Sequence, residues 1–309
     1  MLRSFVVVCA IAAVALGCSP SPESPPSVPD TTAADSIAAG APGTDIYLAP
    51  LTRRDDGTLR LGAPTNVTDR PGYDNQPSFT QDGSALLFSS LRDGQTDVYR
   101  YDLAGDSAAR LTSTPESEYS PTSRPNGMMT VVRVETDGRQ RLWEYTPEGA
   151  PEALVLPGLD AVGYHAWVDD EHVALFVLGE PPTLQYATVD AGTRDTMASR
   201  IGRSLQALPD ARAVSFVQVA ADSTTTLHTL YADTRSVRRL AMTPGRGRGV
   251  DHAWTPGGTV LMADSTRLFA RGPDARRWRA IADLSPLEPS RLAVSPDGST
   301  LALVAADRP

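Results

Sequence analysis

The chain has 309 residues, a formal net charge of −9 at pH 7, and 28 basic residues that are all arginine. An acidic protein without a basic stripe is poorly suited to bind nucleic acid or anionic lipid headgroups, so we expect neither as a partner. The 26 Pro and 24 Gly, with turn signals at short intervals and no long apolar stretch of helical period, indicate an all-β fold.

Residues 1–18 have the features of a targeting segment. Arg3 precedes an apolar run from Phe5 to Leu16, which is shorter than the roughly 20 residues of a membrane-spanning helix. The run ends in Ala-Leu-Gly-Cys, which resembles a bacterial lipobox with cleavage before Cys18 and lipid on its sulfur. Ser19 after the cysteine implies, by the same resemblance, sorting to the outer membrane. An ordinary signal peptide with an incidental cysteine, or an uncleaved anchor, are the alternatives.

Residues 19–43 are rich in Pro, Ser, Ala and Thr and contain little that could be buried. Such a composition predicts a disordered tether rather than a domain. Cys9 lies in the segment that would be removed, so Cys18 would be the only cysteine of the mature chain and no disulfide could form within it. We expect the remainder, residues 44–309, to be one domain.

The clearest repeat unit lies between Asn75 and Asp102 and predicts three short strands joined by two turns. The strands are expected at Gln76–Thr80, Ala85–Ser89 and Asp97–Asp102, with turns at Gln81-Asp82-Gly83 and Arg92-Asp93-Gly94. An antiparallel unit of this size cannot bury its faces alone, so it needs copies of itself.

The copies are present along the chain. A shift of 44 residues places Pro77 on Pro121 and Tyr99 on Trp143, and weaker copies of the first strand and its turn follow. The residue three before the Asp-like turn position serves as an anchor in each copy: Phe79, Ser123, Trp167, Ala207, Trp254 and Val294. Their spacing of 40 to 47 residues, with four strands per unit, is typical of a β-propeller.

The two ends of the domain each supply half a repeat. The last copy stops after its second strand, whereas the segment from Thr44 to Leu51 matches a third strand and Thr65–Thr68 can be a fourth. Strands within Leu292–Ala305 should therefore pair with strands within Asp45–Thr68. This pairing closes a ring of six four-stranded antiparallel blades.

The repeat resembles a known family. NQPSFTQDGSALLFSSLRDGQTDVY is similar to the TolB-like propeller repeat, N-x-P-S-W-S-P-D-G followed by an apolar strand and S-x-R-D-G-x-x-x-I-Y, with Phe79 for the usual Trp. TolB carries an α/β domain before its propeller, and this chain has no room for one. The resemblance is therefore to a TolB-like repeat protein and not to TolB itself, and it implies binding to an envelope protein such as Pal only by analogy.

No catalytic motif is evident in the sequence. It contains no G-x-S-x-G, no H-E-x-x-H, no Gly-rich phosphate loop and no cysteine pair for a metal. Asp169 and Asp170, near His165 and His172, suggest a metal site, but Asp170 occupies the turn position. The GRGRG segment at 245–249 reads as a loop between blades. We expect no bound metal, no cofactor and no catalysis.

The candidate binding site is the mouth at which the first strands begin, because first strands line the channel of a propeller. Equivalent positions there hold polar and aromatic residues: Asn75, Tyr119, Tyr164, His165, Arg203, Asp251, His252 and Arg291. The two histidines share the sequence His-Ala-Trp. They would bind a metal or an anion if exposed, or pack at the strand entrance if buried.

These features predict a monomeric, outer-membrane-anchored lipoprotein with its propeller in the periplasm or at the cell surface. It would be a non-catalytic binding or scaffold module for envelope proteins. The alternative is a glycan-binding protein or metal-dependent enzyme with its site in the channel near His165 and His252.

Overall fold

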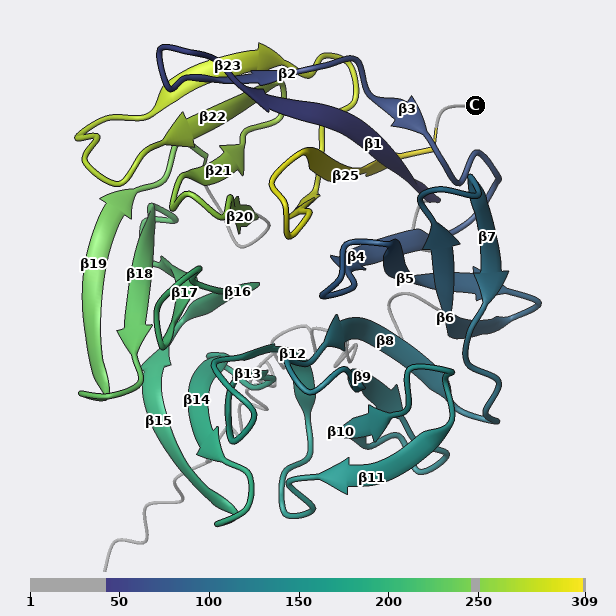
Figure 1. Cartoon of the computed structure of the whole chain (residues 1–309). Helices are drawn as coiled ribbons and strands as arrows, with labels where there is room; N and C mark the ends of the chain where they lie inside the picture. The colour runs from purple at the N-terminus through teal and green to yellow at the C-terminus, as the bar shows by residue number, and fades with distance from the viewer. Residues whose placement is uncertain (1–42, 246–250, 308–309) are drawn as a thin grey trace, which may run out of the picture. The chain divides into compact units, whose positions relative to one another are not determined.

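The computed structural model describes residues 43–245 and 251–307. In these two ranges all regular elements are β-strands, and they form six antiparallel sheets arranged as a ring (Figure 1). The expected all-β, six-bladed propeller is therefore confirmed. The targeting segment, the tether up to residue 42 and residues 246–250 of the glycine-rich loop lie outside the described residues.

Five of the sheets take four consecutive strands each, with the first strand innermost and the fourth outermost (Figure 1). The strands of these sheets are β4 (Asp74–Phe79), β5 (Ala85–Arg92), β6 (Gln95–Asp102) and β7 (Ser107–Arg110); β8 (Ser117–Ser123), β9 (Met129–Val134), β10 (Gln140–Tyr145) and β11 (Pro151–Val155); β12 (Val162–Trp167), β13 (His172–Val177), β14 (Thr183–Thr188) and β15 (Thr193–Ser199); β16 (Ile201–Ala207), β17 (Ala213–Val219), β18 (Thr225–Tyr231) and β19 (Ser236–Met242); β20 (His252–Trp254), β21 (Val260–Ala263), β22 (Arg267–Arg271) and β23 (Arg279–Asp283).

The sixth sheet joins the two ends of the domain. It contains β24 (Arg291–Val294), β25 (Thr300–Ala306), β1 (Thr44–Arg53), β2 (Leu59–Leu61) and β3 (Thr65–Asn66). β1 runs antiparallel to β25 with Ile46 opposite Val304, which confirms the predicted closure. The outer position differs from the expectation, because β3 shares it with β2. β2 forms through a tight turn in which Gly57 has φ +78° and the Asp56 carboxylate accepts from the Thr58 amide.

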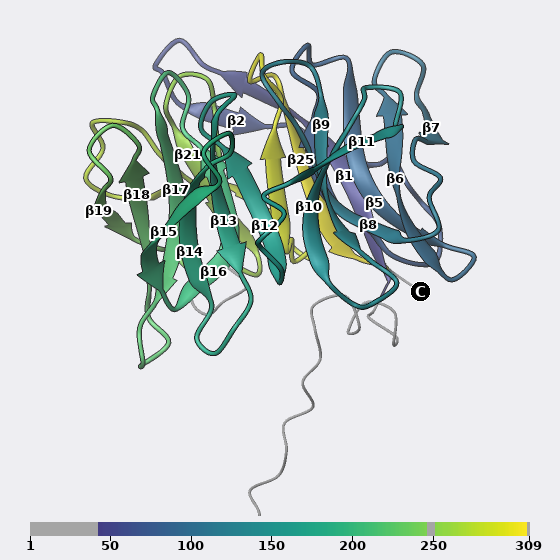
Figure 2. The same ribbon diagram turned by 90° about the horizontal axis from the view of Figure 1, so that it is seen from below.

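The innermost strands, of which β8, β12 and β16 are labelled in Figure 2, run between two faces of the ring. They begin on what we call the start face, which includes Asp74, Ser117, Val162, Ile201, His252 and Arg291. They end at the six anchor residues predicted from the repeat, and the turns after the anchors form what we call the turn face. The anchors therefore mark the same structural position in every blade.

The turn that follows an anchor is stabilised by its own side chains. After Phe79, the Asp82 carboxylate accepts hydrogen bonds from the Thr80 hydroxyl at 2.6 Å and from the Ser84 amide at 3.1 Å, and these bonds lower the pKa of Asp82 to about 2. Gly83 supplies the positive φ of +68° that closes the turn. Asp297 makes the equivalent bonds to Ser295 and Ser299, so the recurring Asp-Gly signal has one physical cause.

The hydrophobic core is divided among the interfaces between neighbouring sheets. Phe88 of β5, for example, packs with Ile46 and Val304 of the closing sheet, and all three side chains are fully buried. Comparable clusters occupy the other five interfaces. Because every sheet is covered on both sides by its neighbours, the second strands are nearly continuous apolar runs.

Candidate functional site

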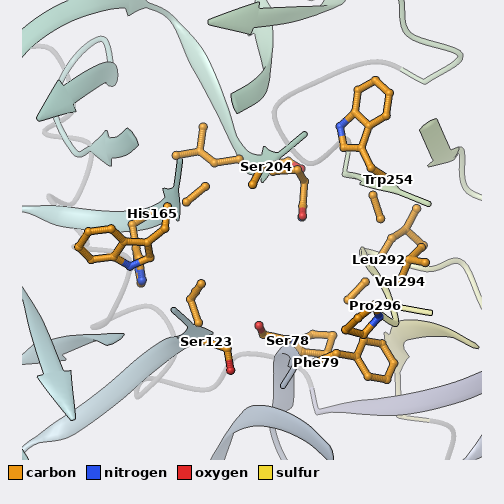
Figure 3. Close-up of a pocket in the computed structure, with 18 of the residues that line it drawn as sticks. Ser78, Phe79, Ser123, His165, Ser204, Trp254, Leu292, Val294 and Pro296 are labelled. Atoms are coloured by element: carbon orange, nitrogen blue, oxygen red, sulfur yellow. The ribbon is translucent and has the colours of Figure 1, made fainter. Parts of the chain in front are cut away.

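A cavity of about 580 Å³ lies on the axis of the ring, and all six innermost strands line it. Figure 3 shows its wall as a ring of side chains around an open centre. The labelled residues come from every innermost strand: Ser78, Phe79, Ser123, His165, Ser204, Trp254, Leu292 and Val294, with Pro296 just beyond β24. The lining extends from Tyr164 and Arg291 near the start face to Pro125 and Pro209 on the turn face.

Two side chains meet across the channel near the start face. β12 and β24 belong to sheets that stand opposite each other, because two other sheets separate them in either direction around the ring. The Arg291 guanidinium nevertheless donates a hydrogen bond of 2.9 Å to the Tyr164 hydroxyl and lies 4.8 Å from the centre of its ring. This contact bridges the channel at its start-face end.

The contact places positive charge at that end of the cavity. Burial alone would raise the pKa of the Tyr164 hydroxyl, yet the charges of Arg291 and Arg203, and hydrogen bonds from both, bring the pKa below its usual value of 10. The neighbouring Tyr73 hydroxyl shows the opposite result: burial raises its pKa, and the arginine charges only partly offset this rise.

His252 is fully buried and lies in a chain of hydrogen bonds between two sheets. Its Nδ1 lies 2.8 Å from the Ser204 hydroxyl, which in turn donates to the Asp251 carboxylate. Nδ1 must therefore carry the proton, and Nε2 accepts from the Ser215 hydroxyl at 2.6 Å. Trp254 donates its indole N–H to the same hydroxyl at 2.8 Å. Burial lowers the pKa of His252 to about 4, so its imidazole is neutral.

His165 repeats the same arrangement in a sheet that one other sheet separates from that of His252. Its Nε2 lies 2.7 Å from the Thr130 hydroxyl, and Trp167 donates its indole N–H to that hydroxyl at 2.9 Å. In each His-Ala-Trp segment, both rings therefore share one hydroxyl from the second strand of the preceding sheet. Burial, with the charge of Arg124, lowers the pKa of His165 to about 3. Its Nδ1 is buried and has no hydrogen-bond partner among the described residues.

The structure brings some of the predicted mouth residues together and separates others. Arg291 contacts Tyr164, and the charges of Tyr119, Tyr164, Arg203 and Arg291 all act on the pKa of Tyr73. Asn75 is buried and donates to the Thr44 hydroxyl at 3.2 Å instead.

The Asp251 carboxylate accepts from the backbone amides of His252 and Leu292, both at 2.9 Å. The two imidazoles are buried between sheets, as described above. A binding role for this mouth therefore stays a prediction.

Sequence reasoning missed several residues that build the site. Ser215 and Thr130 have fully buried hydroxyls in second strands that are otherwise mostly apolar. A polar residue within such an apolar run was the sequence signal that could have identified them. Gln76 was also missed: its side-chain oxygen accepts from the Ser89 hydroxyl at 2.8 Å and from the Ser120 amide at 2.7 Å. Gln76 and Ser120 both have positive φ, at bulges that lie beside the cavity.

Three findings concern the metal site suggested by the sequence and the membrane. Within residues 43–245 and 251–307, no three His, Cys, Asp or Glu side chains gather closely enough to hold a metal ion. The Asp169 carboxylate accepts from the Arg212 guanidinium at 2.6 Å and lies 2.8 Å from His172 Nδ1. In the same ranges there is also no helix long and apolar enough to cross a bilayer.

The architecture is that of a six-bladed β-propeller, and it is similar to that of solved TolB structures. The putative TolB of Agrobacterium tumefaciens is 18% identical with a TM-score of 0.65, over 87% of this chain and 100% of that chain. TolB of Acinetobacter baumannii is 14% identical with a TM-score of 0.54, over 86% of this chain and 64% of that chain. An oligogalacturonate lyase in complex with manganese is 14% identical with a TM-score of 0.57, over 82% of this chain and 81% of that chain.

Sequence comparisons do not assign the chain to a family. No family model matches the chain. An uncharacterized protein of Agrobacterium fabrum is 30% identical over 66 residues, which is 21% of this chain and 22% of that protein. The match therefore spans about a fifth of the length of that curated relative. Likeness at these identities shows a shared fold, which both TolB proteins and at least one enzyme possess.

Proposed function

We propose that the protein is a non-catalytic binding module of the bacterial cell envelope. The observation that carries this proposal is the axial cavity of about 580 Å³, which all six innermost strands line. A ring that is held by cross-sheet hydrogen bonds changes little when a ligand arrives, so little binding energy is lost in ordering it. The buried, neutral imidazoles of His165 and His252 serve as links between sheets, which suits a rigid receptor better than proton transfer.

A ligand or partner would reach this cavity from the turn face. The contact between Arg291 and Tyr164 obstructs the start-face end, whereas Gln81 and Asp210 stand exposed beside the other opening. The start-face mouth, with Tyr119, Tyr164 and Arg291, is the competing location. Aromatic and arginine side chains supply most of the binding energy at protein interfaces, which favours that mouth for a partner that binds the surface.

Crosslinking in intact cells, followed by capture of the protein, tests both the function and the face. We expect an envelope protein to be captured, and the changes Gln81→Arg and Asp210→Arg to weaken its capture. Changing Tyr119 to Ala or Arg291 to Ala should have less effect. The opposite pattern would move the binding site to the start face, and the absence of any specific crosslinked species would contradict the proposal.

We further propose that lipid on Cys18 anchors the protein in the outer membrane, with the propeller in the periplasm or at the cell surface. Support comes from the lipobox-like sequence before Cys18. A lipoprotein anchor carries several acyl chains and holds far better than the marginal binding of a single chain. Cys18→Ser should leave the protein unprocessed or released from membranes. A processed, membrane-bound Cys18→Ser protein would contradict the anchor.

The second candidate is a metal-dependent or glycan-binding site in the channel. One observation favours it: His165 lines the cavity and its Nδ1 has no partner among the described residues. The likeness to the manganese-bound lyase adds support at the level of the fold. Calorimetric titration with Mn²⁺ distinguishes the two candidates. Binding that is lost in His165→Gln favours this candidate, and heat equal to that of a buffer blank counts against it.

A further inference from the structure

Two arginines at the start-face end of the cavity have no acidic partner. Arg203 and Arg291 both line the cavity, and neither forms an ion pair with any described carboxylate. Asp251 also lines the cavity and its charge raises the pKa of Arg291, but it forms no ion pair with Arg291, and both of its oxygens accept from the framework. Oδ1 accepts from the Ser204 hydroxyl and the His252 amide, and Oδ2 accepts from the Leu292 amide.

The positive potential of this pair acts on a neighbouring group. Burial favours the neutral form of the Tyr164 hydroxyl, yet the two guanidinium groups outweigh burial and lower its pKa. An anion placed at the same end would gain from the same charges. Arg203 is exposed and Arg291 half-buried, so the attraction should weaken as the salt concentration rises.

The rest of the cavity wall has a different character. Trp254 and Val294 are half-buried beside the open centre, together with Ser78 and Ser123, so both apolar and polar surface lies between the arginines and the turn face (Figure 3). The volume of about 580 Å³ is within the range of small-ligand pockets. The cavity thus combines a cationic end with a wall that offers both apolar and hydroxyl groups.

We propose that the channel binds a carboxylate attached to an apolar or aromatic body, with the carboxylate at Arg203 and Arg291 and the body against Trp254 and Val294. A guanidinium is the preferred partner of a carboxylate because its N–H groups match the two oxygens. The inference rests on the proposed function, since it names the ligand class for that cavity. The carboxylate belongs either to a free organic acid or to the carboxy-terminal residue of a peptide inserted from the turn face.

Calorimetric titration with 4-phenylbutyrate, using 4-phenylbutyramide as the uncharged analogue, tests the inference. We expect the acid to bind and the amide to bind at least about tenfold more weakly. Arg203→Gln should weaken binding of the acid by about tenfold or more. Arg238→Gln removes an exposed arginine from the outer strand β19, outside the channel, and should leave binding unchanged. Equal binding of acid and amide, or equal loss in both variants, would overturn the inference.

A second titration distinguishes the two sources of the carboxylate. Acetyl-Ala-Phe and its carboxy-terminal amide replace the free acid and amide, and tighter binding of the peptide than of 4-phenylbutyrate assigns the site to a peptide terminus.

The pKa of the Tyr164 hydroxyl provides an independent measurement of binding at this end of the cavity. A bound carboxylate should raise its pKa, and this rise should appear in the ultraviolet absorbance of tyrosinate and vanish in Tyr164→Phe. No rise in the presence of the acid would contradict the location.

Failure of the inference and failure of the proposed function are separable. If neither acid binds at millimolar concentration while an envelope protein is still crosslinked in cells, the channel inference is wrong and the binding module stands. If an acid binds but no partner is captured, the channel site stands and the envelope partner is wrong.

Discussion

Arg291 and Tyr164 stand on opposite sheets of the ring, yet their side chains join by a hydrogen bond of 2.9 Å across the channel. The contact spans the channel at its start-face end. Because Arg291 and Arg203 lower the pKa of the Tyr164 hydroxyl, a change in the charges nearby should change that pKa.

The first prediction concerns this contact. Tyr164→Phe should lower the free energy of unfolding by about 1–2 kcal/mol, because it leaves Arg291 without its acceptor. A tyrosine whose native pKa is lowered contributes stability that is complete above the unfolded value of about 10 and is lost as pH falls through the native pKa. The wild-type advantage should therefore grow from neutral pH toward alkaline pH. Urea unfolding across this range, with exposed Tyr231→Phe as control, measures it. A constant difference would contradict the prediction.

The second prediction concerns acid. His252 and His165 have pKa values of about 4 and about 3 in the native protein, below the usual 6.5, because burial disfavours their charged forms. The unfolded chain binds these protons first, so stability falls as pH drops from about 6.5. For His252 alone the loss is roughly 3 kcal/mol. His252→Gln should flatten the dependence of the urea midpoint on pH between neutrality and about pH 4.5. If the urea midpoint of His252→Gln depends on pH as steeply as that of the wild type, protonation of His252 does not cause the loss of stability.

The third prediction isolates a shared hydroxyl. Thr130→Val keeps the shape of the side chain but leaves His165 Nε2 and the Trp167 indole N–H buried without a partner. The expected loss of stability is about 2–4 kcal/mol. Thr130→Ser keeps the hydroxyl and removes one methyl group, at about 1 kcal/mol. Chemical unfolding of both variants gives the comparison. Equal losses would mean that packing, and not the hydrogen bonds, decides the outcome.

The fourth prediction separates backbone strain from crowding at a turn. A Cβ added at Gly83 would lie 3.6 Å from the nearest atom, in Pro296, so there is room for it. The φ of +68° is unfavourable for a side chain, so Gly83→Ala should cost about 1 kcal/mol. Gly272→Ala is the control, since no atom lies within 4 Å of its added Cβ and its φ is not positive. Similar melting temperatures for the two variants would contradict a strain-based cost.

The fifth prediction tests ring closure. Leu303 of β25 lies opposite Tyr47 of β1 and is fully buried, so Leu303→Ala should cost about 2–5 kcal/mol. Thr300→Ala, at the partly buried start of the same strand, should cost much less. Removing residues 300–309 entirely would leave β1 with an unpaired edge, and aggregation during purification is expected. A soluble, monomeric truncation with the wild-type melting temperature would refute the importance of the closing pair.

The sequence was most informative where structure is local. The anchors from Phe79 to Val294 were placed correctly because each precedes a turn whose own residues stabilise it, as Asp82 does. β2 was missed because a strand of three residues leaves almost no pattern. The closing sheet could be predicted because both half-repeats carry the period, although they lie at opposite ends of the domain.

The site was less predictable because its contacts join different sheets. Equivalent positions identified Tyr164, Arg203 and Arg291, but no local pattern states that two of them meet across the channel. The histidine pair was noticed for its repeated context, yet its partners Thr130 and Ser215 belong to neighbouring sheets. Burial of the two imidazoles follows from those partners and not from the His-Ala-Trp segment itself.

The pairing of β1 with β25 has a kinetic consequence. β1 emerges early from the ribosome or translocon, and its partner strand emerges after every other blade strand. Until then β1 presents an unpaired edge, and the chain must bring together residues of the greatest sequence separation before the ring closes. Such non-local pairings slow folding and prolong exposure to misassembly. We expect ring closure to be the slowest folding step, and the interval before it to be when this protein depends most on chaperones.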